Sequence, residues 1–326
     1  MTVTPSIPGV LSVRVPGMGW CEHNPSGPRR EAVRWSPAAR VVGDTLRWPA
    51  PEVLTDRATS SGPSIVGTGS NACMAWRGAG ADRRIWYSRQ DQLAPGAVPG
   101  DNRYRWGPQL VTPAAFTTSG FPALARYGTR TFLFWRAMTV PTEMRWSELR
   151  GQDWTHPRFG PGAHWAYETL DWMRAVDGVA VAGHRGRLYC AYRVHLGGGT
   201  RIALHAFDQD LMVVEENYTS WRTTEIPALA SDGDNLFMAW RGLEDLNIHW
   251  AVVSGSTPSG EQVLRDRATA AGPSLGVVDR GRLVMVWVGA PGDTAVWWSE
   301  YRNGRWGPQQ AFSDRKMYVA LRASLA

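Results

Sequence analysis

Short runs of apolar, β-branched and aromatic residues recur along the whole chain, and clusters of glycine, proline, aspartate and serine separate them. Runs of this composition are typical of β-strands, and the residues between them favour turns. The pattern therefore predicts an all-β chain with essentially no helix.

Two segments of the chain are copies of one unit. The copy at 59–110 and the copy at 266–310 share the order Gly-Pro-Ser, then an apolar run ending in tryptophan, then Trp-Tyr-Ser or Trp-Trp-Ser, then Trp-Gly-Pro-Gln. Degenerate copies occupy 117–156, 177–221 and 222–265. Each copy contains four predicted strands, and four strands in a period of roughly 40 to 50 residues are typical of a propeller blade.

The two ends of the chain together supply one more blade. Residues 315–326 provide a first strand only, and residues of about 9–50 provide the missing later strands, expected at 9–14, 33–36 and 46–48. Joining both ends in one blade removes sheet edges that would otherwise be exposed. We expect one domain, 1–326, that is a six-bladed β-propeller closed by its N- and C-terminal strands.

The chain contains 18 tryptophans, most of them in register with the repeat. Flat, bulky side chains fill the space between twisted sheets, so packing accounts for the tryptophans at strand positions. Three tryptophans lie outside the repeat: Trp20, Trp165 and Trp172.

The repeat, with its Ser61-Gly-Pro-Ser, Met74-Ala-Trp-Arg-Gly and Trp106-Gly-Pro-Gln segments, resembles the repeats of the PLL-like bacterial lectins. The likeness is strong only at 59–110 and 266–310. It implies a sugar-binding β-propeller with sites at blade junctions, where a sugar stacks on tryptophan and polar side chains bind its hydroxyls. Those lectins have seven blades, whereas this chain has six by its repeats.

An arginine directly follows the predicted second strand in five of the six units. A ring of guanidinium groups would attract a carboxylate, phosphate or sulfate. The alternative is pairing with acidic residues of the same loops, namely Asp82, Glu143, Glu244 or Asp245, and Asp293. The candidate ligand-binding arginines are Arg14, Arg77, Arg136, Arg193 and Arg241.

Two irregular segments are expected to face each other across one mouth of the central channel. One is the insertion at 157–176, and the other is the loop at 16–24 that contains Trp20. Long loops in compact domains usually have a task, so these segments suggest a single ligand pocket. Its candidate aromatic walls are Trp20, Trp165, Tyr167 and Trp172, and its candidate acid and base groups, if the protein is an enzyme, are His164, Glu168 and Asp171.

Two functions fit these features. The first is a carbohydrate-binding, lectin-like propeller that uses tryptophan stacking and arginine or carboxylate contacts on one face. The alternative is an enzyme with one aromatic-lined central pocket, either in small-molecule biosynthesis, such as a cyclase, or a glycosidase. Several equivalent sugars bound at blade junctions would favour the lectin, and one ligand in the central mouth would favour the enzyme. The oligomeric state stays open.

Composition and motifs exclude other partners. The net charge is +6, but arginine supplies nearly all the positive charge and no nucleic-acid-binding motif occurs, so we expect no nucleic-acid partner. No apolar stretch is long enough for a membrane span and no signal peptide is evident, which favours a cytoplasmic protein or one exported without a classical signal. No cofactor or metal motif is found, and Cys21, Cys73 and Cys190 are interpreted as buried thiols.

Overall fold

The structure is a computed structural model that describes residues 18–21, 32–36, 40–42, 45–67, 69–93, 96, 104–138, 143–155, 168–170, 175–254, 257–279, 281–293, 295–312 and 324–325. In these residues every regular element is a β-strand, apart from the short 3-10 helix η1 (Gly69–Asn71). The predicted all-β fold is confirmed.

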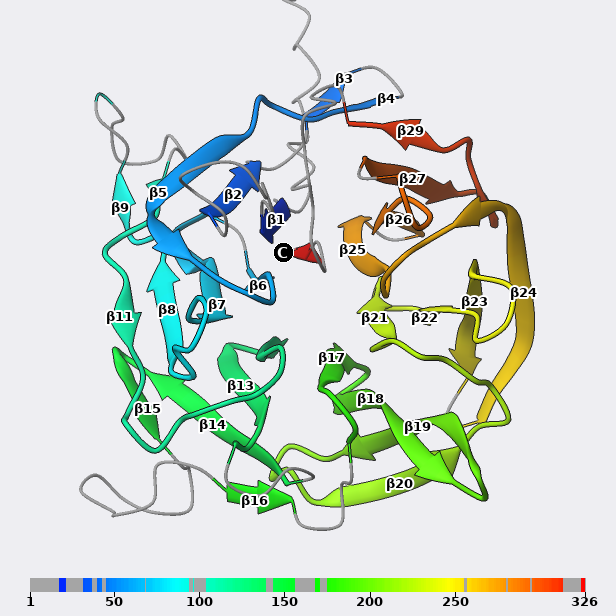
Figure 1. Cartoon of the computed structure of the whole chain (residues 1–326), viewed down its shortest axis with the longest axis horizontal. Coiled ribbons are helices and arrows are strands. Elements are labelled where there is room, and N and C mark those ends of the chain that lie inside the picture. Colours follow the sequence, from blue (N-terminus) through cyan, green and yellow to red (C-terminus); the bar gives the residue numbers. More distant parts are fainter. Residues whose placement is uncertain are drawn as a thin grey trace, which may run out of the picture.

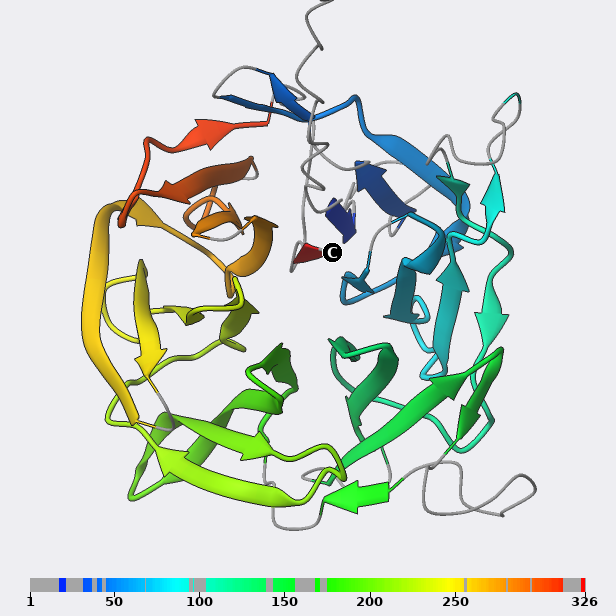
Figure 2. The ribbon, with the colours of Figure 1, turned by 180° about the vertical axis from the view of Figure 1, so that it is seen from behind.

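Antiparallel sheets stand in a circle around a central axis, each with its first strand near the axis and its last strand at the periphery (Figures 1 and 2). This arrangement is a β-propeller, as the repeats predict. Five blades are built from strands that follow one another in the chain, and we name each blade by its first and last strands.

The five contiguous blades have the following strands. Blade β6–β11 contains β6 (Pro63–Val66), β7 (Cys73–Arg77), β8 (Ile85–Arg89) and β11 (Leu110–Val111). A separate hairpin of β9 (Gln92–Leu93) and β10 (Tyr104–Arg105) falls between β8 and β11 in the chain. Blade β12–β16 contains β12 (Ala123–Tyr127), β13 (Arg130–Arg136), β14 (Met144–Arg150), β15 (Asp153–Thr155) and β16 (Glu168–Leu170). Blade β17–β20 contains β17 (Val179–His184), β18 (Arg187–Leu196), β19 (Gly199–Phe207) and β20 (Val213–Tyr218). Blade β21–β24 contains β21 (Ala228–Ser231), β22 (Leu236–Arg241), β23 (Asn247–Ser254) and β24 (Thr257–Ala268), and blade β25–β29 contains β25 (Ser274–Asp279), β26 (Arg282–Val288), β27 (Val296–Arg302), β28 (Arg305–Trp306) and β29 (Gln310–Ala311).

A further sheet, here called the terminal sheet, combines both ends of the chain in the order β30 (Ser324–Leu325), β1 (Met18–Cys21), β2 (Ala32–Ser36) and β5 (Glu52–Ala58). A hairpin of β3 (Arg40–Val42) and β4 (Thr45–Arg47) lies between β2 and β5 in the chain. The prediction placed the strands after β30 at 9–14, 33–36 and 46–48. Residues 9–14 lie outside the described residues, 33–36 falls within β2, and the strand that pairs with the other edge of β2 is β5 and not 46–48. Several apolar runs near the N-terminus have strand composition, and only hydrogen-bonded pairing distinguishes a blade strand from a hairpin.

The same hydrogen bond recurs in four sheets. A buried serine follows the aromatic residue of the third strand, and its hydroxyl donates to the carbonyl oxygen of the residue after the next tryptophan. The four bonds are Ser36 to Pro49 at 3.1 Å, Ser88 to Gly107 at 2.9 Å, Ser147 to Thr155 at 3.2 Å and Ser299 to Gly307 at 2.9 Å. Because a buried hydroxyl needs a partner, this bond explains the Trp-Ser and Tyr-Ser pairs of the sequence repeat.

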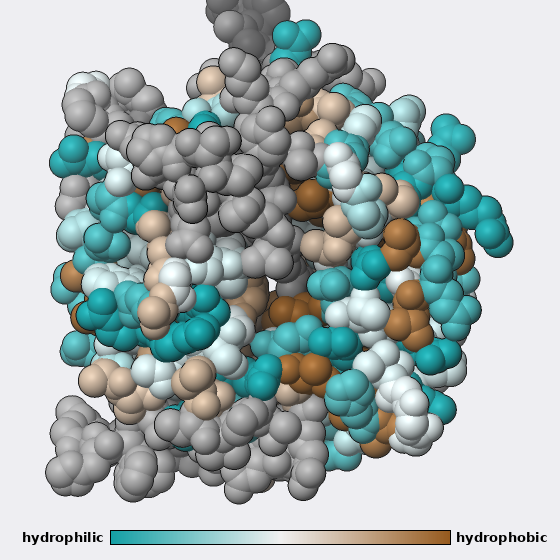
Figure 3. Space-filling model, in the orientation of Figure 1, coloured by the Kyte–Doolittle hydropathy of each residue, from teal (hydrophilic) through white to brown (hydrophobic). Residues whose placement is uncertain are grey.

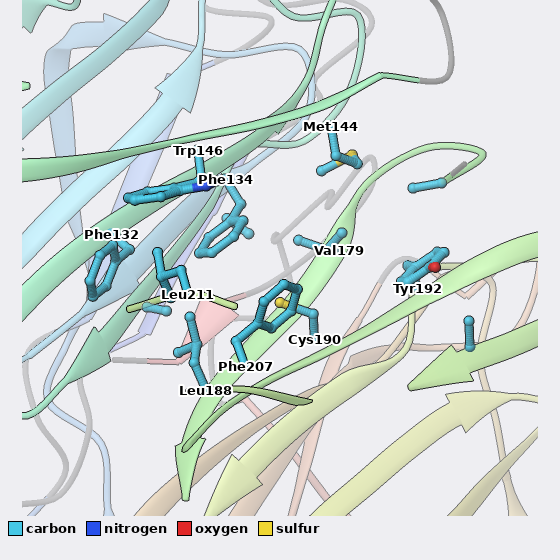
Figure 4. Close-up of a cluster of buried hydrophobic side chains, with 14 of the residues drawn as sticks. Phe132, Phe134, Met144, Trp146, Val179, Leu188, Cys190, Tyr192, Phe207 and Leu211 are labelled. Carbon is cyan, nitrogen blue, oxygen red and sulfur yellow. The ribbon is translucent and has the colours of Figure 1, made fainter. Parts of the chain in front are cut away.

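Tryptophans fill the spaces between neighbouring blades. The second-strand residues Trp76, Trp135, Trp240 and Trp287 are all at most 1% exposed. The interpretation of the repeat tryptophans as packing residues is therefore confirmed for these positions. Between blades β12–β16 and β17–β20, the rings of Phe132, Phe134 and Trp146 form one buried cluster with side chains of the next blade (Figure 4).

Two cysteines have buried, free thiols, as the sequence indicates. Cys73 and Cys190 are 2% and 0% exposed. Burial disfavours the thiolate and raises the pKa of Cys73 to about 12, and it raises the pKa of Cys190 as well. The side chain of Cys21 lies outside the described residues.

Two glycines near the start of repeat units, Gly272 in Gly-Pro and Gly120 in Gly-Phe-Pro, stand where two blades approach closely. A Cβ atom on Gly272 would lie 2.4 Å from the carbonyl oxygen of Ile226, and one on Gly120 would lie 2.2 Å from that of Asp177. Neither contact can be relieved by a side-chain rotation, because the opposing atom belongs to the backbone of the neighbouring blade connection.

We expect Gly272→Ala to lower the free energy of unfolding by about 1–3 kcal/mol, since the blades would have to move apart. Urea denaturation followed by tryptophan fluorescence measures this change. Gly199→Ala is the matched control, because a Cβ there meets only the guanidinium group of Arg222 at 3.6 Å. Equal stability of Gly272→Ala and the parent protein would contradict the close approach of the blades.

Candidate functional site

The arginines that follow second strands fasten blades to their connections. The Arg77 guanidinium donates to the carbonyl oxygen of Ser119 at 3.1 Å, and that of Arg136 donates to the carbonyl oxygen of Val176. Both acceptors lie in the connection to the following blade. These two side chains are half-buried.

The next two arginines pair with residues of the preceding connection. The Arg193 guanidinium lies 2.8 Å from the carboxylate of Asp177, and Arg241 donates to the Thr224 hydroxyl and lies 3.6 Å from the Glu225 carboxylate. Pairing within the protein was the alternative interpretation of these arginines. The observed partners are not the acidic residues that the sequence suggested. Asp82 instead binds Arg84, which directly precedes β8, and Glu143 binds Arg145 of β14.

Most of the predicted residues of the central mouth lie outside the described residues. These are Arg14, His164, Trp165, Tyr167, Asp171 and Trp172. For Trp20 and Glu168 the structure describes the backbone only. Trp20 belongs to strand β1, where it pairs with Arg34 of β2, and not to a loop.

The insertion at 157–176 was expected to be a connection between blades over the channel. The pairing of Glu168 with Trp146 of β14 contradicts this placement. Strands β15 and β16 both pair with β14, at its two ends, so the insertion interrupts the outer strand of blade β12–β16. Figure 1 shows β16 at the periphery of the ring. An outer strand tolerates such an interruption because one of its edges forms no sheet hydrogen bonds. Glu168 therefore does not belong to a central pocket.

The central channel contains a cavity of about 230 Å³ lined by the first strands of the blades. Its lining consists mostly of alanine, serine and valine, and Arg126 is the one charged residue among the described lining residues. Figure 3 shows a narrow opening near the centre of one face, with hydrophobic residues at its margin. The described lining offers no carboxylate for acid or base catalysis.

A larger cavity, of about 850 Å³, lies between the terminal sheet and blade β6–β11. We call it the first junction cleft. It is lined by Trp35 and Glu52–Arg57 on one side and by Gln90 and Tyr104–Pro108 on the other. Unlike the channel, it combines aromatic rings with two carboxylates, Glu52 and Asp56, and two guanidinium groups, Arg57 and Arg105.

Arg57 is the buried charge of this cleft. Its side chain is 3% exposed, lies 5.7 Å from the ring centre of Trp76 and donates through Nη2 to the carbonyl oxygen of Gly107. Asp56, which is half-exposed, lies 3.3 Å from Nε. Burial lowers the pKa of Arg57, although Asp56 opposes this shift. Nε and Nη1 have no hydrogen-bond acceptor among the described residues.

Two tryptophans that pack against each other form the aromatic wall of the first junction cleft. Trp35 and Trp106 meet edge to face with ring centres 5.2 Å apart and an interplanar angle of 86°. Both rings are buried, whereas Tyr104 is half-buried and Glu52 is exposed. The cleft therefore presents an aromatic surface held by packing, beside polar groups that solvent reaches.

A second cavity is also lined by two neighbouring sheets. Its volume is about 290 Å³, and it lies between blade β25–β29 and the hairpin β3–β4. We call it the second junction cleft. Its lining includes Leu46, Trp298 and Glu300, together with Arg302, Asn303 and Arg305 of the hairpin between β27 and β28. Trp48 packs edge to face against Trp298, with ring centres 6.3 Å apart, much as Trp106 packs against Trp35.

The residues of the first junction cleft were not among the site residues predicted from the sequence. One signal was present, because Asp-Arg-Ala-Thr occurs both at 56–59 and at 266–269, directly before the two strongest repeats. Arg267 repeats the role of Arg57. It lies 5.8 Å from the ring centre of Trp287 and donates to the carbonyl oxygen of Gly307 at 2.5 Å.

Within the described ranges, no group of three or more His, Cys, Asp or Glu residues is arranged to hold a metal ion. In the same part of the chain, no helix has the length and hydropathy needed to cross a bilayer.

Comparison with known proteins identifies similar folds. The sequence matches no protein-family model and no curated protein. In structure it is similar to the fucose-specific lectin from Aleuria aurantia, with a TM-score of 0.56 and 11% identity over 92% of this chain and 96% of that one. SapL1 lectin in complex with alpha methyl fucoside gives 0.54 and 13% over 94% and 100%, and BP39L lectin from Burkholderia pseudomallei gives 0.50 and 13% over 90% and 83%. At these identities the likeness shows the propeller fold alone.

Proposed function

We propose that this protein is a carbohydrate-binding, lectin-like propeller and that the first junction cleft holds a saccharide. The observation that carries this proposal is the composition of the cleft, a cavity of about 850 Å³ with tryptophan and tyrosine beside carboxylate and guanidinium groups. Sugar rings have apolar C–H faces that pack on aromatic rings, and their hydroxyls both donate and accept hydrogen bonds. The similarity in fold to three lectin propellers supports the same function.

Each group of the cleft has a role in this proposal. Tyr104, the half-buried aromatic residue, provides the stacking surface, since the buried Trp106 is already in contact with Trp35. Glu52 and Asp56 accept hydrogen bonds from sugar hydroxyls. Arg57 donates from Nε and Nη1, which have no acceptor among the described residues. Charge-assisted hydrogen bonds of this kind are stronger than neutral ones.

We also propose that the ring has six blades, the sixth being the terminal sheet. The inner strands contact one another in the order β6, β12, β17, β21 and β25, and β30 contacts both β25 and β6. The contact of Trp48 with Trp298 at the closing junction repeats that of Trp106 with Trp35. Relationship to the PLL-like lectins, which rests on the two strong repeats, is part of this proposal.

Isothermal titration calorimetry with methyl α-fucoside, methyl α-mannoside and methyl β-galactoside tests the function. We expect at least one of these sugars to bind, and Tyr104→Ala to weaken it about tenfold or more, which corresponds to about 1.4 kcal/mol. Tyr218→Ala is the control, because Tyr218 is 45% exposed on β20 of another blade. If none of the sugars binds, or if both variants bind as the parent does, this proposal is wrong.

A further inference from the structure

The junction between blades β21–β24 and β25–β29 repeats the construction of the first junction cleft. We call it the Tyr301 junction. One wall carries Trp250, Leu264 and Arg267, and the other carries Tyr301 and Trp306. The chain along the first wall reads Gln-Val-Leu-Arg-Asp-Arg-Ala-Thr at 262–269, and the matching segment of the first junction cleft reads Glu-Val-Leu-Thr-Asp-Arg-Ala-Thr at 52–59. Six of these eight positions are identical, so the two junctions are built from the same local sequence.

Both junctions also contain the same pair of tryptophans. Trp250 and Trp306 meet edge to face, with ring centres 6.0 Å apart and an interplanar angle of 86°. Trp35 and Trp106 have the same interplanar angle, with ring centres 5.2 Å apart. In each pair one tryptophan belongs to the third strand of a sheet, and the other belongs to the Trp-Gly-Pro segment of the following blade. The two tryptophan pairs are therefore equivalent.

The Tyr301 ring lies against the tryptophan pair of its junction. Its centre is 5.4 Å from that of Trp250, 5.3 Å from that of Trp306 and 5.2 Å from that of Phe237. Aromatic rings at these separations are in contact. Tyr301 is half-buried, and burial raises the pKa of its hydroxyl. A side chain of the protein itself therefore occupies the space beside this tryptophan pair.

Gln90 is the counterpart of Tyr301 at the first junction cleft. Each of the two stands two positions after a buried serine, Ser88 or Ser299, whose hydroxyl donates to the glycine carbonyl oxygen of Trp-Gly-Pro. The Gln90 side chain is 7% exposed and lines the cleft of about 850 Å³. Glutamine has no aromatic ring to lay on the tryptophan pair. The first junction cleft is therefore open at the position that Tyr301 fills in the other junction.

We propose that this one position decides which of the two junctions takes a ligand. Gln90 leaves the first junction cleft open, and Tyr301 closes the Tyr301 junction from within. A phenol ring offers an apolar face and a hydroxyl, as a sugar does, so Tyr301 packs on the tryptophan pair in place of a ligand. The nature of the ligand rests on the proposed function, whereas closure of the Tyr301 junction rests on the ring contacts.

Calorimetric titration of the whole chain with methyl α-fucoside, methyl α-mannoside and methyl β-galactoside tests the role of Gln90. We expect Gln90→Tyr to weaken any of these sugars that binds the parent protein by about tenfold or more, because the new ring would lie against Trp35 and Trp106. Gln209→Tyr is the matched control. It adds a tyrosine at an exposed position between β19 and β20, and it should bind sugar as the parent does.

The compound p-cresol, which has the ring and hydroxyl of a tyrosine side chain, tests the role of Tyr301. A sugar is not the suitable probe here, because the counterpart of Tyr104 is Gly304 and the opened junction would lack that stacking surface. Tyr301→Ala should gain binding of p-cresol, which should raise its melting temperature by at least about 2 °C more than that of the parent. Tyr301→Gln should behave as Tyr301→Ala does, whereas Tyr301→Phe keeps the ring and should show no gain.

The two probes separate this inference from the proposed function. If the parent binds a sugar and Gln90→Tyr binds it equally well, the inference is wrong and the proposed function stands. If none of the sugars binds the parent, the proposed function is wrong and p-cresol alone decides the inference. A gain in Tyr301→Ala or Tyr301→Gln that Tyr301→Phe does not share would support closure by Tyr301, and equal responses of all these variants would overturn it.

Discussion

Trp240→Ala is expected to lower the free energy of unfolding by about 3–5 kcal/mol, the usual cost of emptying a buried aromatic site. Trp240 is 0% exposed and stacks on Trp221, with ring centres 4.5 Å apart and an interplanar angle of 20°. Its side chain belongs to the cluster between blades β17–β20 and β21–β24. A cavity there cannot collapse without moving one sheet toward the other, so little of the loss can be recovered.

Urea denaturation followed by circular dichroism measures this effect. Met212→Ala is the control, because Met212 is 52% exposed, and we expect its stability to stay within about 0.5 kcal/mol of the parent. A loss below about 1 kcal/mol for Trp240→Ala would show that the tryptophans do not pack the blades together.

Stability should fall by about 3 kcal/mol as the pH decreases from 6.5 to 4, because His205 must remain neutral in the fold. His205 is 0% exposed, its Nε2 atom lies 3.1 Å from the hydroxyl of Tyr192, and burial lowers its pKa from 6.5 to about 4. Between these two values the unfolded chain binds a proton that the folded protein does not. The contribution of neutral His205 is therefore complete above pH 6.5 and is lost as the pH falls toward 4.

His205→Gln distinguishes this residue from other titrating groups. Burial also lowers the pKa of His184, while Asp82 has a pKa of about 2 and loses its contribution only in more acidic solution. Chemical denaturation of the parent and the variant at several pH values between 4 and 7.5 gives the two slopes. The variant should show a clearly shallower dependence, and equal slopes would mean that His205 does not control acid stability.

The propeller was predictable because its determinants are local and repeated. The Gly-Pro, Trp-Ser and Trp-Gly-Pro elements each correspond to one contact, namely a close approach of backbones, a buried serine hydrogen bond and an aromatic junction. Each contact recurs at similar spacing, so the repeat is visible without knowledge of the partner. The strands near the N-terminus were misplaced because there the repeat is degenerate, and β1 and β5 are identified only by their pairing with β2.

The candidate site was predicted less well, since its residues come together only across blade boundaries. The arginines after second strands were visible as a pattern, but Arg77 binds the carbonyl oxygen of Ser119, a partner 42 positions away that has no side-chain signature. Similarly, nothing in the sequence places Glu52 and Tyr104 in one cleft, because different strands of adjacent sheets carry them.

The sequence by itself determined the all-β class, the repeating unit and the role of the buried tryptophans, because short-range periodicity encodes strands and their packing faces. The tertiary structure alone decided which arginines are engaged, where the insertion at 157–176 joins its blade and which junctions open into clefts. These properties depend on the distance between neighbouring sheets and on which charged side chains the sheets bring together. The sequence of a single strand predicts neither of them.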